Sequence, residues 1–180
     1  AKELLWRALL NERESVRRSG TYGLVALGNA SEDIFLEVIK SPIKWLRKAG
    51  VYGLGEVSTL NKEIFDVVKE CLLEDSSKYV RSVAAGSLGC LGRRTIAVGQ
   101  GLEWISKCVE ALIQSLQQEK NQLSMDLAQK RNIKFVRPTD ESDVCEGMGI
   151  DFGLERFEPV RSAVRENVLW ALVMFCSHGE

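Results

Sequence analysis

The chain contains an internal repeat, which constrains the fold more than any other feature of the sequence. Residues 16–24, 46–54 and 80–88 each open with an aliphatic residue and Arg, and each has Leu eight positions after the aliphatic residue. Residues 164–172 form a fourth, weaker copy. Counting the aliphatic residue as zero, small residues recur at positions four and seven: Gly20 and Gly23, Gly50 and Gly53, Ala84 and Ser87, and in the last copy only Ala171. Because these positions share one helix face, the repeat predicts four helices that neighbouring helices approach closely.

A more apolar segment precedes each copy, at residues 3–10, 33–39, 62–73 and 102–116. Its apolar residues follow the spacing of a helix with one packed face. Turn-forming residues separate the two segments of a unit, as in Ser41–Pro42. The sequence therefore predicts an all-α domain of about four helix pairs. The predicted units span about residues 2–28, 31–58, 60–92 and 101–176.

The third unit resembles the HEAT-repeat family. Asp75 stands at the turn, Val80 and Arg81 open the second helix, and Leu88–Gly89 follows an alanine-rich stretch. The other units depart from this pattern at the turn, where they carry Asn11, Ser41–Pro42 and Pro159. The resemblance implies a right-handed superhelical α-solenoid that binds proteins, with the second helices on its concave side. It also implies that the Arg after the aliphatic residue ties neighbouring repeats together through the turn acid. The sequence leaves open whether further repeats flank the chain.

A long segment at about residues 118–158 interrupts the fourth unit. Residues 118–132 are polar and are expected to extend the preceding helix, whereas residues 137–143 have the composition of a loop. Residues 145–153 contain three glycines and no hydrophobic period, and acidic residues outnumber basic ones around them. Two interpretations stay open: a mobile excursion that is dispensable for folding, or a specific binding loop.

No catalytic or metal-binding constellation is visible. The five cysteines contain no CxxC pair, and the only histidine, His178, lies near the end of the chain. Cys71 and Cys108 stand among apolar helical residues and are expected to be buried. The sequence therefore predicts no enzyme, no cofactor and no metal. Unpaired cysteines, together with the lack of a signal peptide or an 18-residue apolar run, predict a cytoplasmic protein without a membrane partner.

The candidate binding residues lie on the second helices. These helices are rich in Lys and Arg, although the whole chain has a net charge of −1. Repeat positions two and six, opposite the small-residue face, pair a cation with an aromatic residue one turn apart. The predicted binding residues are Arg18, Tyr22, Lys48, Tyr52, Arg93 and Trp170. The alternative is that these aromatic residues are buried under a neighbouring repeat. Trp6, Trp45 and Trp104 are expected to be core residues.

Three functions are compatible with these features. The leading hypothesis is a non-enzymatic scaffold that holds an acidic or extended segment of a partner protein on its concave face. The second is a nucleic-acid binder that follows a phosphate backbone with the same basic face. The third rests on the resemblance alone, because HEAT-like proteins occur as subunits of bilin lyases. The sequence does not indicate an oligomeric state.

Overall fold

The chain folds into helices throughout the part that the structure, a computed structural model, describes: residues 2–97, 99, 102–129 and 163–176. The α-helices are α1 (Lys2–Leu9), α2 (Glu14–Ala26), α3 (Glu32–Val38), α4 (Lys44–Val57), α5 (Lys62–Glu74), α6 (Lys78–Ala97), α7 (Leu102–Gln129) and α8 (Ala163–Cys176). A short 3-10 helix spans Gly28–Ser31. These ranges confirm the all-α prediction. The continuation of α7 to Gln129 also confirms that the polar residues after 117 extend this helix.

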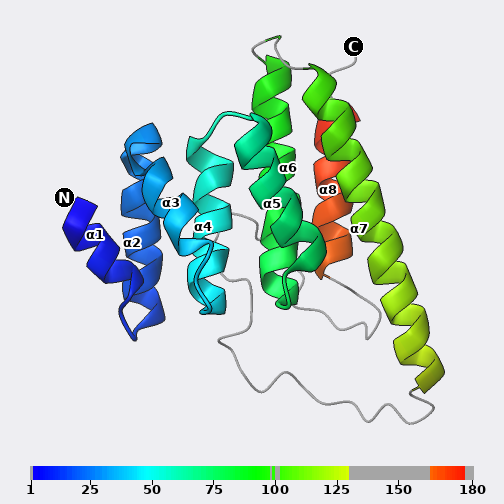
Figure 1. Ribbon diagram of the computed structural model, residues 1–180, viewed down its shortest axis with the longest axis horizontal. Coiled ribbons are helices and arrows are strands. Elements are labelled where there is room, and N and C mark those ends of the chain that lie inside the picture. Colours follow the sequence, from blue (N-terminus) through cyan, green and yellow to red (C-terminus); the bar gives the residue numbers. More distant parts are fainter. Residues whose placement is uncertain (1, 98, 100–101, 130–162, 177–180) are drawn as a thin grey trace.

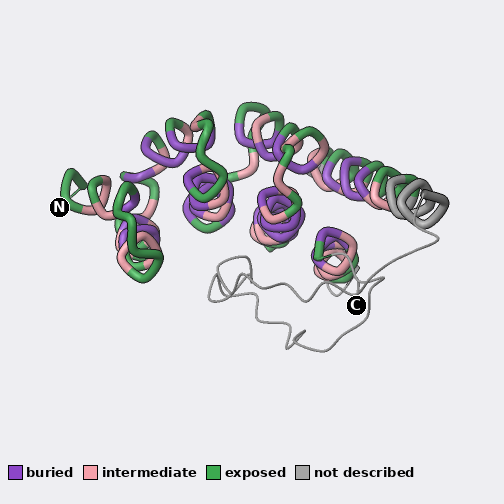
Figure 2. Tube along the Cα trace, turned by 90° about the horizontal axis from the view of Figure 1, so that it is seen from below, coloured by how far each residue is buried: buried purple, intermediate pink, exposed green. Residues whose placement is uncertain are grey.

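The helices are arranged in two rows. The odd-numbered helices form one row and the even-numbered helices form the other, from the N-terminus at one end to α7 and α8 at the opposite end (Figure 1). Each even-numbered helix packs against the odd-numbered helix before it, and α2, α4 and α6 also pack against the next even-numbered helix. Figure 2 shows that the two rows bend together, with α2, α4, α6 and α8 on the inner side of the bend. We call this side the inner row and the other side the outer row.

The repeated face of each second helix is turned toward its neighbours. Leu24, Leu54 and Leu88, at repeat position eight, are fully buried. A Cβ atom added to Gly20 would lie 2.8 Å from the Cβ of Ala8, and one added to Gly50 would lie 2.9 Å from the carbonyl oxygen of Phe35. The small residues therefore allow α1 and α3 to approach their partner helices closely, as the sequence predicted.

In the first three units, an arginine stabilises the turn between the two helices. Arg17 donates to the carbonyls of Asn11 and Glu12, at 2.9 and 2.6 Å. The equivalent Arg47 donates to the carbonyls of Ser41 and Pro42, and Arg81 to those of Asp75 and Ser76. Since a turn leaves several carbonyls without a partner, these bonds stabilise the helix–helix connection.

The same arginines reach forward to the next unit. Arg47 binds both carboxylate oxygens of Asp75, at 2.7 and 2.9 Å, and Arg81 binds Glu119 on α7 at 3.0 Å. Burial alone would raise the pKa of Asp75, but hydrogen bonds from Arg47 and from the Ser77 amide outweigh it, so this pKa lies below its ordinary value. The Arg47–Asp75 pair thus joins two successive units through the turn acid.

Two further expectations concern the interior and the interrupting segment. Cys71 and Cys108 are buried as predicted, and burial raises the pKa of both thiols to about 12. The remainder of the 118–158 segment, from residue 130 onward, lies outside the described residues.

Within the described part of the chain, no helix combines the length and the apolar character that crossing a membrane requires.

Candidate functional site

Four of the six predicted binding residues lie on α2 and α4, which are adjacent in the inner row. We call Arg18, Tyr22, Lys48 and Tyr52 the inner-face cluster. The rings of Tyr22 and Tyr52 meet edge to face, with centroids 6.2 Å apart and an interplanar angle of 79°. Arg18 lies one turn before Tyr22 and is 3.7 Å from Glu14. The repeat thus places two equivalent tyrosines in contact across the boundary between two units.

The two tyrosines differ in exposure. Tyr22 is 38% exposed, whereas Tyr52 is half-buried and packs against the edge of the core. Burial, followed by the charge of Glu56 and the proximity of Tyr22 and Cys90, raises the pKa of Tyr52 to about 12. The cluster therefore offers one accessible ring supported by one largely enclosed ring.

Arg93 belongs to the same side of the molecule, further along α6. Burial raises the pKa of Cys90, Glu56 raises it further, and Arg94 and Arg93 oppose these effects. Arg94 donates hydrogen bonds to the carbonyls of Gly55 and Ser58 at the end of α4. Arg93 is exposed and stands next to this structural arginine on α6. Arg93 therefore acts on Cys90, which in turn influences Tyr52 of the inner-face cluster.

Trp170 lies apart from the inner-face cluster, because α6 separates α8 from α4. Its ring is half-buried and sits near Gly89, at which an added Cβ would lie 3.2 Å from Trp170 Cζ3. On α6, repeat positions two and six are Ser82 and Gly86, and both are buried. Asn167 Nδ2 of α8 donates to the carbonyl and hydroxyl oxygens of Ser82, at 2.9 and 2.7 Å. The face that is accessible on α2 and α4 is thus a helix junction on α6.

A second group of aromatic residues was not predicted from the sequence, and the prediction for Trp45 was wrong. Trp45 was predicted to be a core residue, but it is 44% exposed, and the Arg17 guanidinium lies 4.8 Å from its ring centroid. Tyr79 is the equivalent residue of the next unit. Its ring centroid lies 5.9 Å from the Lys44 ammonium group and 4.9 Å from that of Lys78. Trp45 and Tyr79 both directly precede the aliphatic residue of their repeat copy, and this shared register was the signal available in the sequence.

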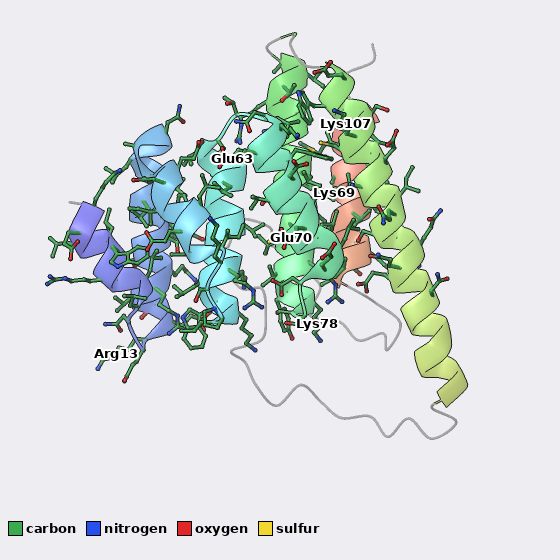
Figure 3. The ribbon with its side chains drawn as sticks, viewed as in Figure 1. Arg13, Glu63, Lys69, Glu70, Lys78 and Lys107 are labelled. Carbon is green, nitrogen blue, oxygen red and sulfur yellow. The ribbon has the colours of Figure 1, made fainter. Side chains whose placement is uncertain are left out.

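Trp6 and Trp104 are half-buried and pack against the core. On the outer row, Trp104 contacts Phe65 with ring centroids 5.6 Å apart, and Lys107 lies 4.0 Å from its ring centroid. Figure 3 labels Lys69 and Lys107 on α5 and α7, respectively. These residues provide a basic, aromatic surface on the outer row.

The arrangement is suited to binding through side-chain contacts. Among the described residues, no group of three His, Cys, Asp or Glu side chains is placed to hold a metal ion. The buried thiols of Cys71 and Cys108 stay protonated near neutral pH, because their pKa values are about 12. Tyrosine and arginine, which the accessible inner face provides, are the residue types enriched in protein-binding hot spots.

Comparisons with known proteins assign no family to this chain. No protein-family model matches its sequence, and no curated protein shows a significant match.

Proposed function

We propose that this protein is a non-enzymatic scaffold, built as a HEAT-like α-solenoid, that binds a partner protein on its inner row. The inner-face cluster carries this proposal, because it brings two cations and two contacting aromatic rings together on adjacent helices. An acidic or extended partner segment would pair its carboxylates with Arg18 and Lys48 and place a side chain against Tyr22.

The arginines at repeat position one contribute to the fold itself, so we do not include them in the proposed site. Arg17, Arg47 and Arg81 are committed to turn carbonyls, and the last two also bind carboxylates of the next unit. Arg18, one residue after Arg17, lies 3.7 Å from Glu14 of the same helix. The unpaired thiols of Cys71, Cys90 and Cys108 fit a reducing compartment, and we propose the cytoplasm.

The thermal unfolding of Tyr22→Ser and Tyr52→Ser comes first in testing the site. Because Tyr22 is 38% exposed, its replacement is expected to shift stability by only about 0.5 kcal/mol. Tyr52 is half-buried, so Tyr52→Ser is expected to cost more, on the order of 1–2 kcal/mol. A large loss of stability in Tyr22→Ser would assign that ring to the core and remove it from the site.

The binding test uses the triple variant Arg18→Ser/Tyr22→Ser/Lys48→Ser, which keeps the supporting Tyr52 ring. Affinity purification from the native host, followed by mass spectrometry, is expected to recover a partner with the parent and much less of it with the variant. The control variant Lys69→Ser/Lys107→Ser also removes two positive charges, but from the outer row. Equal recovery by the parent and the triple variant would contradict the proposal.

A nucleic-acid partner is the second candidate, because the inner-face cluster is basic as well as aromatic. Retention on DNA or heparin that falls steeply with salt concentration would favour it, since phosphate contacts release counterions. The role as a bilin-lyase subunit stays a prediction from the family resemblance, and co-purification with a coloured partner would bring it forward.

A further inference from the structure

A second surface lies where the first helix of each unit turns into the second. We call it the turn edge: the turns before α2, α4 and α6, together with the first turn of each of these helices. Its exposed cations include Arg13, Lys44 and Lys78, one from each successive unit. Figure 3 places Arg13 and Lys78 at the same end of the helices, near the lower ends of α2 and α6. The three turns therefore present their cations along one edge of the molecule.

Two carboxylates in or beside the turn edge are neutralised by arginines of the fold. The Asp75 side chain is 5% exposed and is bound by Arg47, and the Glu119 side chain is 15% exposed and is bound by Arg81. The exposed acids of the edge are Glu12, Glu14 and Glu74, and Glu14 is paired with Arg18. The Arg17 guanidinium donates hydrogen bonds to carbonyl groups, which are neutral and do not cancel its positive charge. The edge is therefore positively charged, and the N-terminal ends of three helices add to this potential.

Large apolar side chains are exposed among these cations. Trp45 is 44% exposed, its neighbour Ile43 is 37% exposed, and Leu10 in the preceding turn is 53% exposed. The Arg17 guanidinium lies over one face of Trp45, which holds the ring in place while leaving much of its surface accessible. Lys44 and Lys78 approach the Tyr79 ring from two successive helices. The ring thus restrains both lysine side chains, which reduces the entropy that an anionic ligand must remove.

We propose that the turn edge binds an acidic peptide segment that carries large apolar side chains. Its carboxylates pair with Arg13, Lys44 and Lys78, and its apolar side chains pack on Trp45 and Ile43. The aliphatic Ile43 and Leu10 favour a peptide over single-stranded nucleic acid, because bases stack on aromatic planes and gain little from aliphatic neighbours. This surface is separate from the inner-face cluster, so the proposal goes beyond the function proposed above and does not depend on it.

The test measures the fluorescence anisotropy of labelled probes with the full chain. The first probe is a short peptide in which single Leu residues interrupt pairs of Glu, and the second is a Glu-only peptide of equal length. The third is an oligodeoxythymidine of similar charge. The parent is expected to bind the Glu/Leu peptide more tightly than either of the other probes, because only this peptide satisfies both the cations and the apolar side chains.

Two edge variants separate the contributions to binding. Lys44→Glu/Lys78→Glu is expected to weaken binding of the Glu/Leu peptide by about tenfold or more, since like charges then face each other. Trp45→Ser is expected to weaken the Glu/Leu peptide selectively and to leave the residual binding of the Glu-only peptide unchanged. If the charge reversal impairs folding, as judged by circular dichroism, Lys44→Gln/Lys78→Gln provides the same comparison with a smaller perturbation.

The matched control is Lys69→Glu/Lys107→Glu. It makes the same charge change at two lysines that also lie over rings, 5.9 Å from Phe65 and 4.0 Å from Trp104, but on the outer row. This control is expected to bind the peptide as the parent does. An equal loss in the outer-row control, tighter binding of the oligonucleotide, or no peptide binding by the parent would each overturn the proposal.

Discussion

The α2–α4 junction and the α6–α8 junction occupy equivalent places in the repeat. They differ in the size of the residues that form them. At the first junction, Tyr22 and Tyr52 meet edge to face, and Tyr22 remains 38% exposed. At the second junction, a Cβ added to Gly89 would lie 2.9 Å from the Cα of Ala171, so the two backbones are in close approach. Small residues therefore close one junction, whereas aromatic residues leave the other with an accessible surface.

Buried polar contacts reinforce this difference. In the α6–α8 junction, Asn167 donates to both oxygens of Ser82, and Ser82 is fully buried. Ser87 Oγ makes a similar contact in the α4–α6 junction, donating to the Val51 carbonyl at 3.0 Å. Because buried polar groups are costly without partners, these bonds specify how the helices dock. The α6–α8 junction is thus held by buried contacts, whereas α2 and α4 leave an aromatic side chain accessible at their junction.

The largest expected effect comes from filling the tight junction. Gly89→Ala is expected to destabilise the protein by about 1–3 kcal/mol, because the new methyl group meets the backbone of Ala171. Gly23→Ala is the matched control: the nearest atoms that its methyl group would meet belong to the Leu5 side chain, which can rotate, and Ala gains up to about 1 kcal/mol of helix propensity over Gly. Denaturant midpoints measure both effects, and equal midpoints would refute the assignment of a tight α6–α8 junction.

The second prediction removes the polar contact of the same junction. Asn167→Ala removes the Asn167 donor from the two buried Ser82 oxygens and is expected to cost about 1–3 kcal/mol, nearer the middle of that range. Tyr52→Phe changes one polar atom in the α2–α4 junction and is expected to cost less than about 0.5 kcal/mol. Equal unfolding free energies for the two variants would show that the junctions do not differ as described.

A third prediction concerns the Arg47–Asp75 pair, which joins the two regions. Asp75→Asn is expected to cost about 1–2 kcal/mol at neutral pH, because a charge-assisted hydrogen-bond pair is lost. The folded-state pKa of Asp75 lies below its ordinary value of 3.8, so the parent keeps this contribution above about pH 4. It loses the contribution as the pH falls through the lower folded-state pKa.

The stability difference between parent and Asp75→Asn should therefore shrink on acidification below about pH 4. Unfolding measured at a series of pH values tests this dependence. A difference that stays constant down to the lowest pH at which the parent folds would contradict the role of the Asp75 charge.

The smallest effect is expected at Tyr52. Its pKa is raised to about 12 in the folded protein, so folding favours the neutral phenol. This contribution is complete below the ordinary pKa of 10.0 and is lost as the pH rises from there to about 12. Titration of the phenolate absorbance is expected to show a component near pH 12 that Tyr52→Phe removes. If the parent and the variant lack this difference, Tyr52 is not enclosed in the α2–α4 junction.

Much of the fold was predictable from the repeat, and so was the identity of its buried face. The spacing of Leu24, Leu54 and Leu88 placed three second helices, and all three residues are buried. The Arg47–Asp75 contact also followed from the family resemblance. The exposure of Trp45 did not, because an apolar residue in the first turn of a helix has the same pattern in a sequence whether or not another element covers it.

The candidate site was only partly predictable for a related reason. Positions two and six of each copy were expected on an accessible face, and on α2 and α4 this face holds the inner-face cluster. On α6 the same positions hold Ser82 and Gly86, which are buried where α8 packs. Helix positions and the packed stripe arise from contacts that recur every three or four residues, so local spacing specifies them. The accessibility of the opposite face depends on a helix more than 80 positions away in the chain, as in the 85-residue separation of Ser82 and Asn167, and packing alone brings such residues together.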